Sequence, residues 1–380
     1  MGTDFFKSPR LGVLGGGQLG RMLLQDAINL DINISVLDPD PAAPCRHLVS
    51  HFETGSFKDY DTVYRFGKTV DILTVEIEHV NVDALEALEK EGVLVRPSSK
   101  ILRLVQDKGD QKIFYRTHGI PTAEFHLINN KAELPDHISL LPVMQKLRKG
   151  GYDGKGVTPI RSTKDFDNAF TEASVLEKMV DFSKEIAVIV ARNADGQCVS
   201  YPAVEMQFNP EANLVELLFC PAAITTEQEQ KAEAIARKLA DSLSLEGVLA
   251  VEMFITKDGN ILVNEMAPRP HNSGHATIEA NVTSQYEQHL RAILNLPLGD
   301  TKLLTPAAMV NILGEKGAEG PVNYEGMNHC LSLSGVHIHL YGKEKTKPFR
   351  KMGHVTVCDA DLTSAIQKAN IVRETLKAKS

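Results

Sequence analysis

Two apolar, β-branched runs flank Asp258-Gly259 and predict a β-hairpin with these two residues as its turn. Counting outward from this turn places Glu252 opposite Glu265, with both carboxylates on one face of the hairpin. Opposed carboxylates repel each other, so the pair needs either solvation or a compensating cation. Mg²⁺ favours oxygen ligands, and Asn264 offers a further oxygen. The pattern alone leaves a solvated hairpin face and a metal site equally open.

Short apolar runs alternate with helical patterns at the start of the chain and predict an α/β domain over residues 1–100. The run over 11–14 leads into Gly15-Gly-Gly-Gln-Leu-Gly20, which matches G-x-G-x-x-G before a predicted helix. Backbone N–H groups at such a helix start can hold an anion. The next run, over 34–37, ends in Asp38, where a dinucleotide fold holds a ribose. An NAD-dependent oxidoreductase and a plain tight turn are both compatible with this segment.

A third predicted strand, over 71–75, ends beside Glu76 and Glu78, at the edge where open α/β sheets bind ligands. These acids are compatible with a solvated edge and with contacts to ligand hydroxyl groups. A change of pattern after residue 100 predicts a second domain over residues 101–296, with a lid-like part at about 120–180.

The second domain begins with a predicted amphipathic helix over 101–118, which carries Lys108 and Lys112. A strand ending at Lys146 then leads into Arg148–Gly156, nine residues that include four glycines, two lysines and an arginine. Backbone N–H groups and ammonium groups of this kind suit a triphosphate. The loop is not a Walker A sequence, and a basic surface turn is the alternative.

Further strands are predicted over 175–180, around Glu177, and over 186–192, directly after Glu185. A helix capped by Thr225 is predicted from Glu227 to Leu243, with Gln228 completing a capping box. Residues 297–380 are predicted to form a third, β-rich domain that follows a helix over 285–294. Its predicted elements are strands over 308–313, 336–340 and 354–357 and a helix over 362–376. Between the second and third strands, the segment over 343–351 carries five cations, which suits a solvated turn or a phosphate clamp.

Composition places the chain among soluble globular proteins, with 43% hydrophobic and 24% charged residues. A formal net charge of −8 argues against nucleic acid as a partner. The five cysteines are scattered, without a zinc spacing or a disulfide framework, which favours a reducing cytoplasm. Because no apolar run approaches the ~18 residues of a membrane span, we expect a cytoplasmic protein without membrane contacts.

Five motifs occur together in an order that resembles N5-carboxyaminoimidazole ribonucleotide synthetases, a purine-biosynthesis branch of the ATP-grasp superfamily. The resemblance covers about residues 10–360 of the chain. The motifs are Gly15-Gly-Gly-Gln-Leu-Gly20, Gly150-Gly-Tyr-Asp-Gly-Lys-Gly156, Asn264-Glu-Met-Ala-Pro-Arg269, His271-Asn-Ser-Gly-His275 and Arg350-Lys-Met-Gly-His354.

The resemblance implies a Rossmann-like preATP-grasp domain, a two-part ATP-grasp fold and a small C-terminal domain, assembled as a homodimer. It implies ATP, Mg²⁺ (or Mn²⁺) and bicarbonate as reactants or cofactors. The bicarbonate would be joined, through carboxyphosphate, to the exocyclic amine of 5-aminoimidazole ribonucleotide.

The resemblance also implies which residues bind ATP and metal. Glu252, Glu265 and Asn264 would hold the metal. The ATP set is Lys108, Lys146, Gly151, Tyr152, Asp153, Gly154, Lys155, Gly156, Glu177, Lys178, Met179, Val180, Glu185, Phe208, Asn264 and Glu265. Two members depart from the family pattern, because Lys108 stands where Arg is frequent and Phe208 stands where a His is expected.

By the same resemblance, residues from all three domains would bind the ribonucleotide and carry out the chemical step. We expect Arg269 to stabilise carboxyphosphate, Asp153 to take the amine proton, and His271 and His275 to line the bicarbonate pocket rather than bind zinc. The catalytic set is Asp153, Arg269, His271 and Asn272, and the ribonucleotide set is Gly17, Gln18, Leu19, Glu76, Tyr152, Asp153, Asn272, Ser273, Lys343, Arg350 and Lys351.

Three rival functions remain at this point. A different ATP-grasp ligase, such as a formate-dependent glycinamide ribonucleotide transformylase, would share the acid pair and differ in its substrates. An oxidoreductase would leave the central region without a role. A non-catalytic nucleotide sensor would bind ATP without cleaving it.

Overall fold

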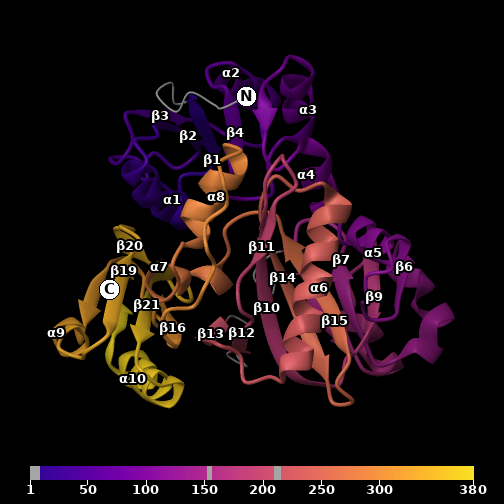
Figure 1. Cartoon of the computed structure of the whole chain (residues 1–380). Helices are drawn as coiled ribbons and strands as arrows, with labels where there is room; N and C mark the ends of the chain where they lie inside the picture. The colour runs from indigo at the N-terminus through magenta and orange to yellow at the C-terminus, as the bar shows by residue number, and fades with distance from the viewer. Residues whose placement is uncertain (1–8, 152–155, 209–214) are drawn as a thin grey trace.

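The computed structural model describes residues 9–151, 156–208 and 215–380 (Figure 1). The first part is a five-stranded parallel sheet in the order β3-β2-β1-β4-β5. Its central strands are fully buried because helices cover both faces, which explains their continuous apolar sequence. The elements are β1 (Leu11–Leu14), α1 (Gln18–Asn29), β2 (Ile34–Asp38), β3 (His51–Thr54), α2 (Tyr60–Gly67), β4 (Ile72–Val75), α3 (Val82–Lys90) and β5 (Leu94–Val95).

The single helix predicted over 101–118 is wrong, because this segment forms α4 (Ser99–Val105) and α5 (Lys108–Thr117). The break lies at Asp107, which has an extended backbone and whose carboxylate accepts two backbone N–H groups of the next turn. Asp is a favoured N-cap residue for this reason. Lys108 therefore lies at the first position of a new helix.

The predicted lid segment contains a four-stranded antiparallel sheet in the order β6-β9-β7-β8. It has a small apolar core of its own, and Figure 1 shows it beside α5 at the edge of the large sheet. A bridge between Thr122 and Val263 joins the entry to this segment to the central hairpin. The elements are β6 (Phe125–Ile128), η1 (Lys131–Leu140), β7 (Val143–Leu147), β8 (Val157–Ile160), η2 (Thr163–Asn168) and β9 (Ser174–Lys178).

The largest sheet has nine strands, in the order β15-β14-β10-β12-β13-β16-β21-β19 with β11 paired to β10. Helix α6 (Thr226–Leu243) packs its apolar stripe on one face, and the predicted capping box of Thr225 and Gln228 is confirmed. Helix α8 (Gln285–Ile293) returns to the first part, as expected, and packs beside α1. Other elements are β10 (Phe182–Arg192), β11 (Cys198–Ser200), β12 (Val204–Phe208), β13 (Val215–Cys220), β14 (Gly247–Thr256), β15 (Ile261–Ala267), η3 (Asn272–Gly274) and α7 (Thr277–Ala280).

The C-terminal part is rich in β-strands, as predicted, but its main strands do not form a separate sheet. Strand β16 pairs with β13, so β16, β21 and β19 extend the central sheet. Helix α10 packs on this extension. The elements are β16 (Ala307–Leu313), β17 (Gly320–Pro321), β18 (Asn323–Glu325), α9 (Met327–Leu331), β19 (Val336–Leu340), β20 (Lys345–Thr346), β21 (Lys351–Cys358), α10 (Leu362–Thr375) and β22 (Lys377–Lys379).

The central hairpin has the predicted pairing at its functional end and a different turn. Glu252 faces Glu265, whereas Ile255 faces Ile261, so the connection is longer by one residue than the predicted two-residue turn. The register shifts between Glu252 and Met253, where one extra residue is accommodated as a bulge at Asn264. The longer turn and the bulge offset each other, which restores the acid pair.

The order of the three parts agrees with the predicted fold class, while the domain boundaries at residues 100 and 296 stay predictions. Among the helices of the described residues, none has both the length and the apolar character that crossing a bilayer requires.

Candidate active site

The acid pair lies at the centre of a network of oppositely charged groups. Lys108, at the start of α5, has its Nζ 2.5 Å from Glu265 Oε2. Lys146, on β7 of the lid sheet, donates to Asn264 Oδ1 at 2.9 Å. A bulge re-aims side chains relative to a regular strand, which explains how two consecutive residues, Asn264 and Glu265, both face these lysines.

The electrostatics of the pair fit a divalent cation. Burial, Glu265 and Glu185 raise the pKa of Glu252 more than Lys108 and Lys351 lower it. Lys108 holds the pKa of Glu265 well below its usual range. The oxygen ligands that Glu252, Glu265 and Asn264 offer form a set that suits Mg²⁺.

Glu185 lies near this pair on β10, and burial raises its pKa to about 7. Phe208 ends β12, two residues beyond Met206, the register partner of Glu185. Met179 and Val180 join β9 to β10 and are half-buried, while Lys178 is more exposed and pairs with Glu124 at 3.8 Å. The predicted nucleotide residues 177–180 thus lie on the segment that connects the lid sheet with the large sheet.

The basic glycine loop is described only at its ends. Gly151 and Gly156 flank it, and Gly156 has a φ of +76°, a conformation that favours glycine. Tyr152, Asp153, Gly154 and Lys155 lie outside the described residues. Arg148, counted among the cations of this loop, instead binds Asp107 with two hydrogen bonds of 2.8 and 2.9 Å.

The loop after β15 carries Arg269 and His271, and it brings His271 to the acid pair. Arg269 Nε lies 2.8 Å from Glu78 Oε1, so this guanidinium is anchored by an acid of the first part. His271 Nδ1 accepts the backbone N–H of Ser273 at 3.3 Å, which leaves the proton of a neutral ring on Nε2. Nε2 lies 3.6 Å from Glu252 Oε1. The sequence had not distinguished Glu78 from a solvated acid.

Asn272 has a buried amide without a hydrogen-bond partner among the described residues, for both Oδ1 and Nδ2. Because buried polar groups are normally paired, this amide is a strong candidate for a ligand contact. Ser273, next to it, is 1% exposed, and its hydroxyl lies 2.9 Å from His271 Nδ1. Ser273 therefore orients the imidazole from within the protein.

The expectation that His275 lines the pocket with His271 is wrong. His275 is 1% exposed, contacts the hydroxyl of Tyr286 at 3.0 Å and lies with its ring 4.5 Å from that of His354. Burial lowers its pKa well below the usual value, so it is a neutral core residue.

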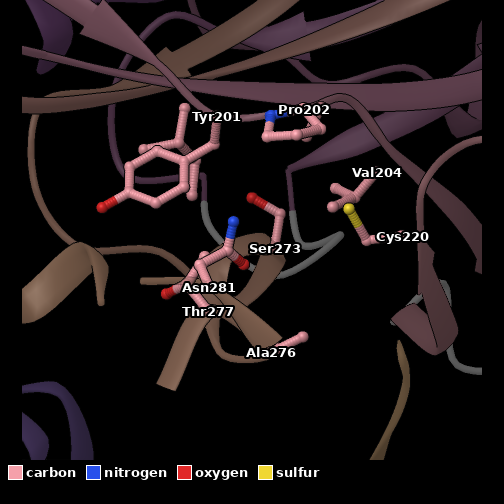
Figure 2. Close-up of a pocket in the computed structure, with 10 residues that line it drawn as sticks. Tyr201, Pro202, Val204, Cys220, Ser273, Ala276, Thr277 and Asn281 are labelled. Carbon is pink, nitrogen blue, oxygen red and sulfur yellow. The ribbon is translucent and has the colours of Figure 1, made fainter. Parts of the chain in front are cut away.

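A small cavity also lies behind this loop, between Ser273 and the face of the large sheet (Figure 2). Its volume of ≈ 10 Å³ is about that of one water molecule. It is therefore too small for a substrate. The labelled residues that line it are Tyr201, Pro202, Val204, Cys220, Ser273, Ala276, Thr277 and Asn281.

Two carboxylates occupy the backbone donors of the first glycine loop. Glu76 accepts the N–H groups of Gly17 and Leu19, both at 3.1 Å. Asp38 accepts the N–H of Gly16 at 2.6 Å, and does not lie free to hold a ribose. The dinucleotide interpretation of this loop loses its main support, since an anionic pyrophosphate would meet carboxylates there.

The cations of the segment over 343–351 differ in what they contact and in how exposed they are. Lys343 Nζ donates to Gln18 Oε1 at 3.0 Å and to the carbonyl of Lys351 at 2.7 Å. Arg350 is half-buried and donates to the carbonyl of Lys345 at 2.6 Å. The predicted residues Gln18, Lys343 and Lys351 thus meet across the first and last parts of the chain, and Lys345 is exposed.

Known families agree with this arrangement. A model described as an ATP-grasp domain matches residues 113–286, and one described as a ribonucleotide synthetase preATP-grasp domain matches residues 9–106. A third, described as a phosphoribosylaminoimidazole carboxylase C-terminal domain, matches residues 307–368. The fold and the site therefore define the chain as an ATP-grasp ligase.

Comparison with similar proteins shows which family of ATP-grasp ligases the chain resembles. N5-carboxyaminoimidazole ribonucleotide synthase of Bacillus subtilis is 37% identical over 91% of this chain and 90% of its own length. The crystal structure of N5-carboxyaminoimidazole ribonucleotide synthetase from Thermotoga maritima superposes with a TM-score of 0.91, at 42% identity over 98% of this chain and 99% of its own. The N5-carboxyaminoimidazole synthase of Aspergillus clavatus, solved with ADP and 5-aminoimidazole ribonucleotide, superposes with a TM-score of 0.88. It is 37% identical over 97% of this chain and 99% of its own.

The chain belongs to the N5-carboxyaminoimidazole ribonucleotide synthase family. Several relatives named phosphoribosylaminoimidazole carboxylase are longer, and the chain spans only 64–70% of their length.

Proposed function

We propose that this protein uses ATP to join bicarbonate to the exocyclic amine of 5-aminoimidazole ribonucleotide. The products are N5-carboxyaminoimidazole ribonucleotide, ADP and phosphate. The observation that carries this proposal is the convergence of three parts of the chain on one acid pair. Glu252 and Glu265 come from the hairpin, Lys108 from α5 and Lys146 from the lid sheet. Arg269, on the loop after the hairpin, binds Glu78 of the first part.

ATP would bind between the lid sheet and the large sheet, with its phosphates beside Lys108 and Lys146. Both lysines contact metal-ligand candidates in the free protein, and the phosphates offer them stronger anionic partners. Glu252, Glu265 and Asn264 would hold Mg²⁺, or Mn²⁺ in its place. When bound, the metal ion supplies positive charge that offsets the charge of the phosphate oxygens.

The reaction has two steps with balanced bonds. A bicarbonate oxygen attacks the γ-phosphorus of ATP, the bond to the β-phosphate oxygen breaks, and ADP and carboxyphosphate result. The amine nitrogen of the ribonucleotide then attacks the carboxyl carbon of carboxyphosphate, and inorganic phosphate leaves with the electron pair of the C–O bond. The amine gives up one proton, for which Asp153 is the proposed acceptor.

Residues of the loop after β15 would orient the bicarbonate. The Arg269 guanidinium offers donors in a planar fork that suits a carboxylate. The amide of Asn272, which has no hydrogen-bond partner within the described parts of the chain, offers donor and acceptor atoms, and the Nε2–H of His271 points toward the acid pair. Gln18, Lys343, Arg350 and Lys351 would bind the ribonucleotide and its phosphate.

ADP release from Mg-ATP and bicarbonate, with and without 5-aminoimidazole ribonucleotide, tests the proposal. We expect release to depend strongly on the ribonucleotide and to disappear in Glu265→Gln, with an unchanged circular dichroism spectrum. Release that is indifferent to the ribonucleotide would instead indicate another ATP-grasp ligase. Retained turnover in Glu265→Gln would move the metal site elsewhere.

We also propose that the protein acts as a homodimer, in line with the family resemblance. Light scattering at working concentration should give twice the 41.7 kDa mass of the chain. A monomer with full activity would contradict this assembly.

A further inference from the structure

Lys112 is a buried cation that the proposed chemistry does not use. Its side chain is 3% exposed and lies in α5, one turn beyond Lys108. Its Nζ lies 3.0 Å from Glu177 Oε2 and donates to the hydroxyl of Thr122 at 2.7 Å. An ammonium group in such a place needs a close counter-charge, and Glu177 is the carboxylate that provides it.

Glu177 is shared between two lysines. Its Oε1 lies 3.1 Å from the Nζ of Lys146, while its Oε2 faces Lys112. Burial alone would raise the pKa of this carboxyl, but Lys146 and Lys112 hold it below its usual value. The carboxylate is therefore charged. Burial lowers the pKa of Lys112 to about 8, so below this pH the three groups together carry one net positive charge.

Lys146 is the member of this cluster that reaches the active site. It extends from the lid sheet, and its Nζ also donates to Asn264 at 2.9 Å. If Lys112 were neutral, Glu177 and Lys146 would form a closed pair without net charge. Lys146 would then attract a phosphate less strongly and would be held closer to the carboxylate.

Lys112 also joins the segments on which the lid sheet is mounted. The Thr122 hydroxyl that accepts from Lys112 donates to the carbonyl of Val263 at 2.8 Å, on β15, the strand that carries Glu265. One ammonium group thus contacts the lid strand β9 directly and the catalytic hairpin through one hydroxyl. Lys112 is therefore placed to influence both the position of Lys146 and the net charge of the group formed by Lys112, Glu177 and Lys146.

We propose that Lys112 is a positioning residue for ATP binding, which keeps Lys146 available to the phosphates by balancing the charge of Glu177. This inference rests on the proposed function, in which Lys146 contacts the phosphates of ATP. Lys112 itself touches no substrate.

The test measures Mg-ADP affinity by calorimetry, together with the KM values for ATP and for the ribonucleotide. In Lys112→Met we expect Mg-ADP to bind about tenfold more weakly, since one unit charge near the phosphates is lost. The KM for ATP should rise in parallel, and the KM for the ribonucleotide should stay within twofold. A general loss of structure would instead raise both KM values.

A double variant separates charge from packing. Lys112→Met with Glu177→Gln removes both charges of the buried pair and restores the single net positive charge, which is then that of Lys146. Because Glu177 belongs to the predicted ATP set and also pairs with Lys146, we expect the double variant to recover part of the affinity and to bind Mg-ADP more tightly than Lys112→Met. If it binds Mg-ADP as weakly as Lys112→Met, the charge-balance inference is wrong.

Lys184→Met is the matched control. Lys184 pairs with Glu205 at 2.7 Å, and both residues belong to the large sheet. Because successive side chains of a strand alternate between the two faces, Lys184 lies on the face opposite that of Glu185. The Lys184→Met substitution should leave the Mg-ADP affinity unchanged. Wild-type protein that binds no Mg-ADP overturns the proposed function and this inference together. Wild-type binding that Lys112→Met fails to weaken overturns the inference alone.

Discussion

His289 joins the first part of the chain to the central sheet, and its neutral state makes stability depend on pH. It lies in α8 with 0% exposure. Its Nδ1 accepts the backbone N–H of Val248 at 3.3 Å, so the proton of the neutral ring is on Nε2, 2.9 Å from the hydroxyl of Thr74. A protonated ring would break the contact with Val248 and place a charge in the core.

The size of the effect follows from two pKa values. Burial lowers the pKa of His289 to about 3, while an unfolded chain has a histidine pKa of about 6.5. The stability due to the neutral ring is therefore complete above pH 6.5 and is lost as the pH falls toward 3. At pH 5 the unfolded state binds a proton that the folded state excludes, which lowers the free energy of unfolding by about 2 kcal/mol relative to pH 8.

The variant His289→Gln removes this titration and keeps one acceptor and one donor at the site. Between pH 8 and pH 5, the wild-type free energy of unfolding should fall by about 2 kcal/mol more than that of the variant. The buried residues His275 and His354 remain in both proteins, so their contributions cancel in the difference. His47→Gln, at an exposed position, is the control and should follow the wild type.

Urea unfolding at the two pH values measures the difference. Because the chain has no tryptophan, circular dichroism and tyrosine fluorescence are the probes, and coincident transitions are required before a free energy is extracted. Parallel pH profiles of wild type and His289→Gln would refute the reasoning, because they would show that His289 takes up its proton equally in both states.

Three further predictions concern the substrate sites. Arg350→Ala should raise the KM for the ribonucleotide about tenfold and leave that for ATP within twofold; equal effects on both would remove Arg350 from the phosphate site. Gly17→Ala places a Cβ 2.9 Å from Glu76 Oε2 and closer still to Oε1, so the carboxylate must shift. The KM for the ribonucleotide should increase, whereas Gly92→Ala, whose Cβ would meet no atom of the described residues within 4 Å, should affect stability alone. Asn272→Ala should reduce kcat/KM by about tenfold or more and change the melting temperature little, because its amide has no partner to lose among the described residues; a large loss of stability with normal kinetics would assign Asn272 to the core.

Local sequence determined several features of this protein. The hairpin flanking Asp258-Gly259, the opposed pair Glu252 and Glu265, and the capped start of α6 all depend on neighbours within a few residues. The turn length did not follow from the same signal. Two-residue and three-residue hairpin loops both use a glycine with positive φ, and Gly259 has a φ of +84°. The bulge at Asn264 then restored the acid pair that the shorter turn had predicted.

Tertiary structure decided which charges meet this pair. Lys108 lies 157 residues from Glu265, Lys146 lies 118 residues from Asn264, and Lys343 lies 325 residues from Gln18. A periodic pattern shows which face of an element is buried but not which element covers it. The same limit explains why His275, four residues from His271 in a polar loop, belongs to the core, and why Lys112 on a basic helix is buried beside Glu177. Local rules set the ligands of the site, and long-range packing set the charges that surround them.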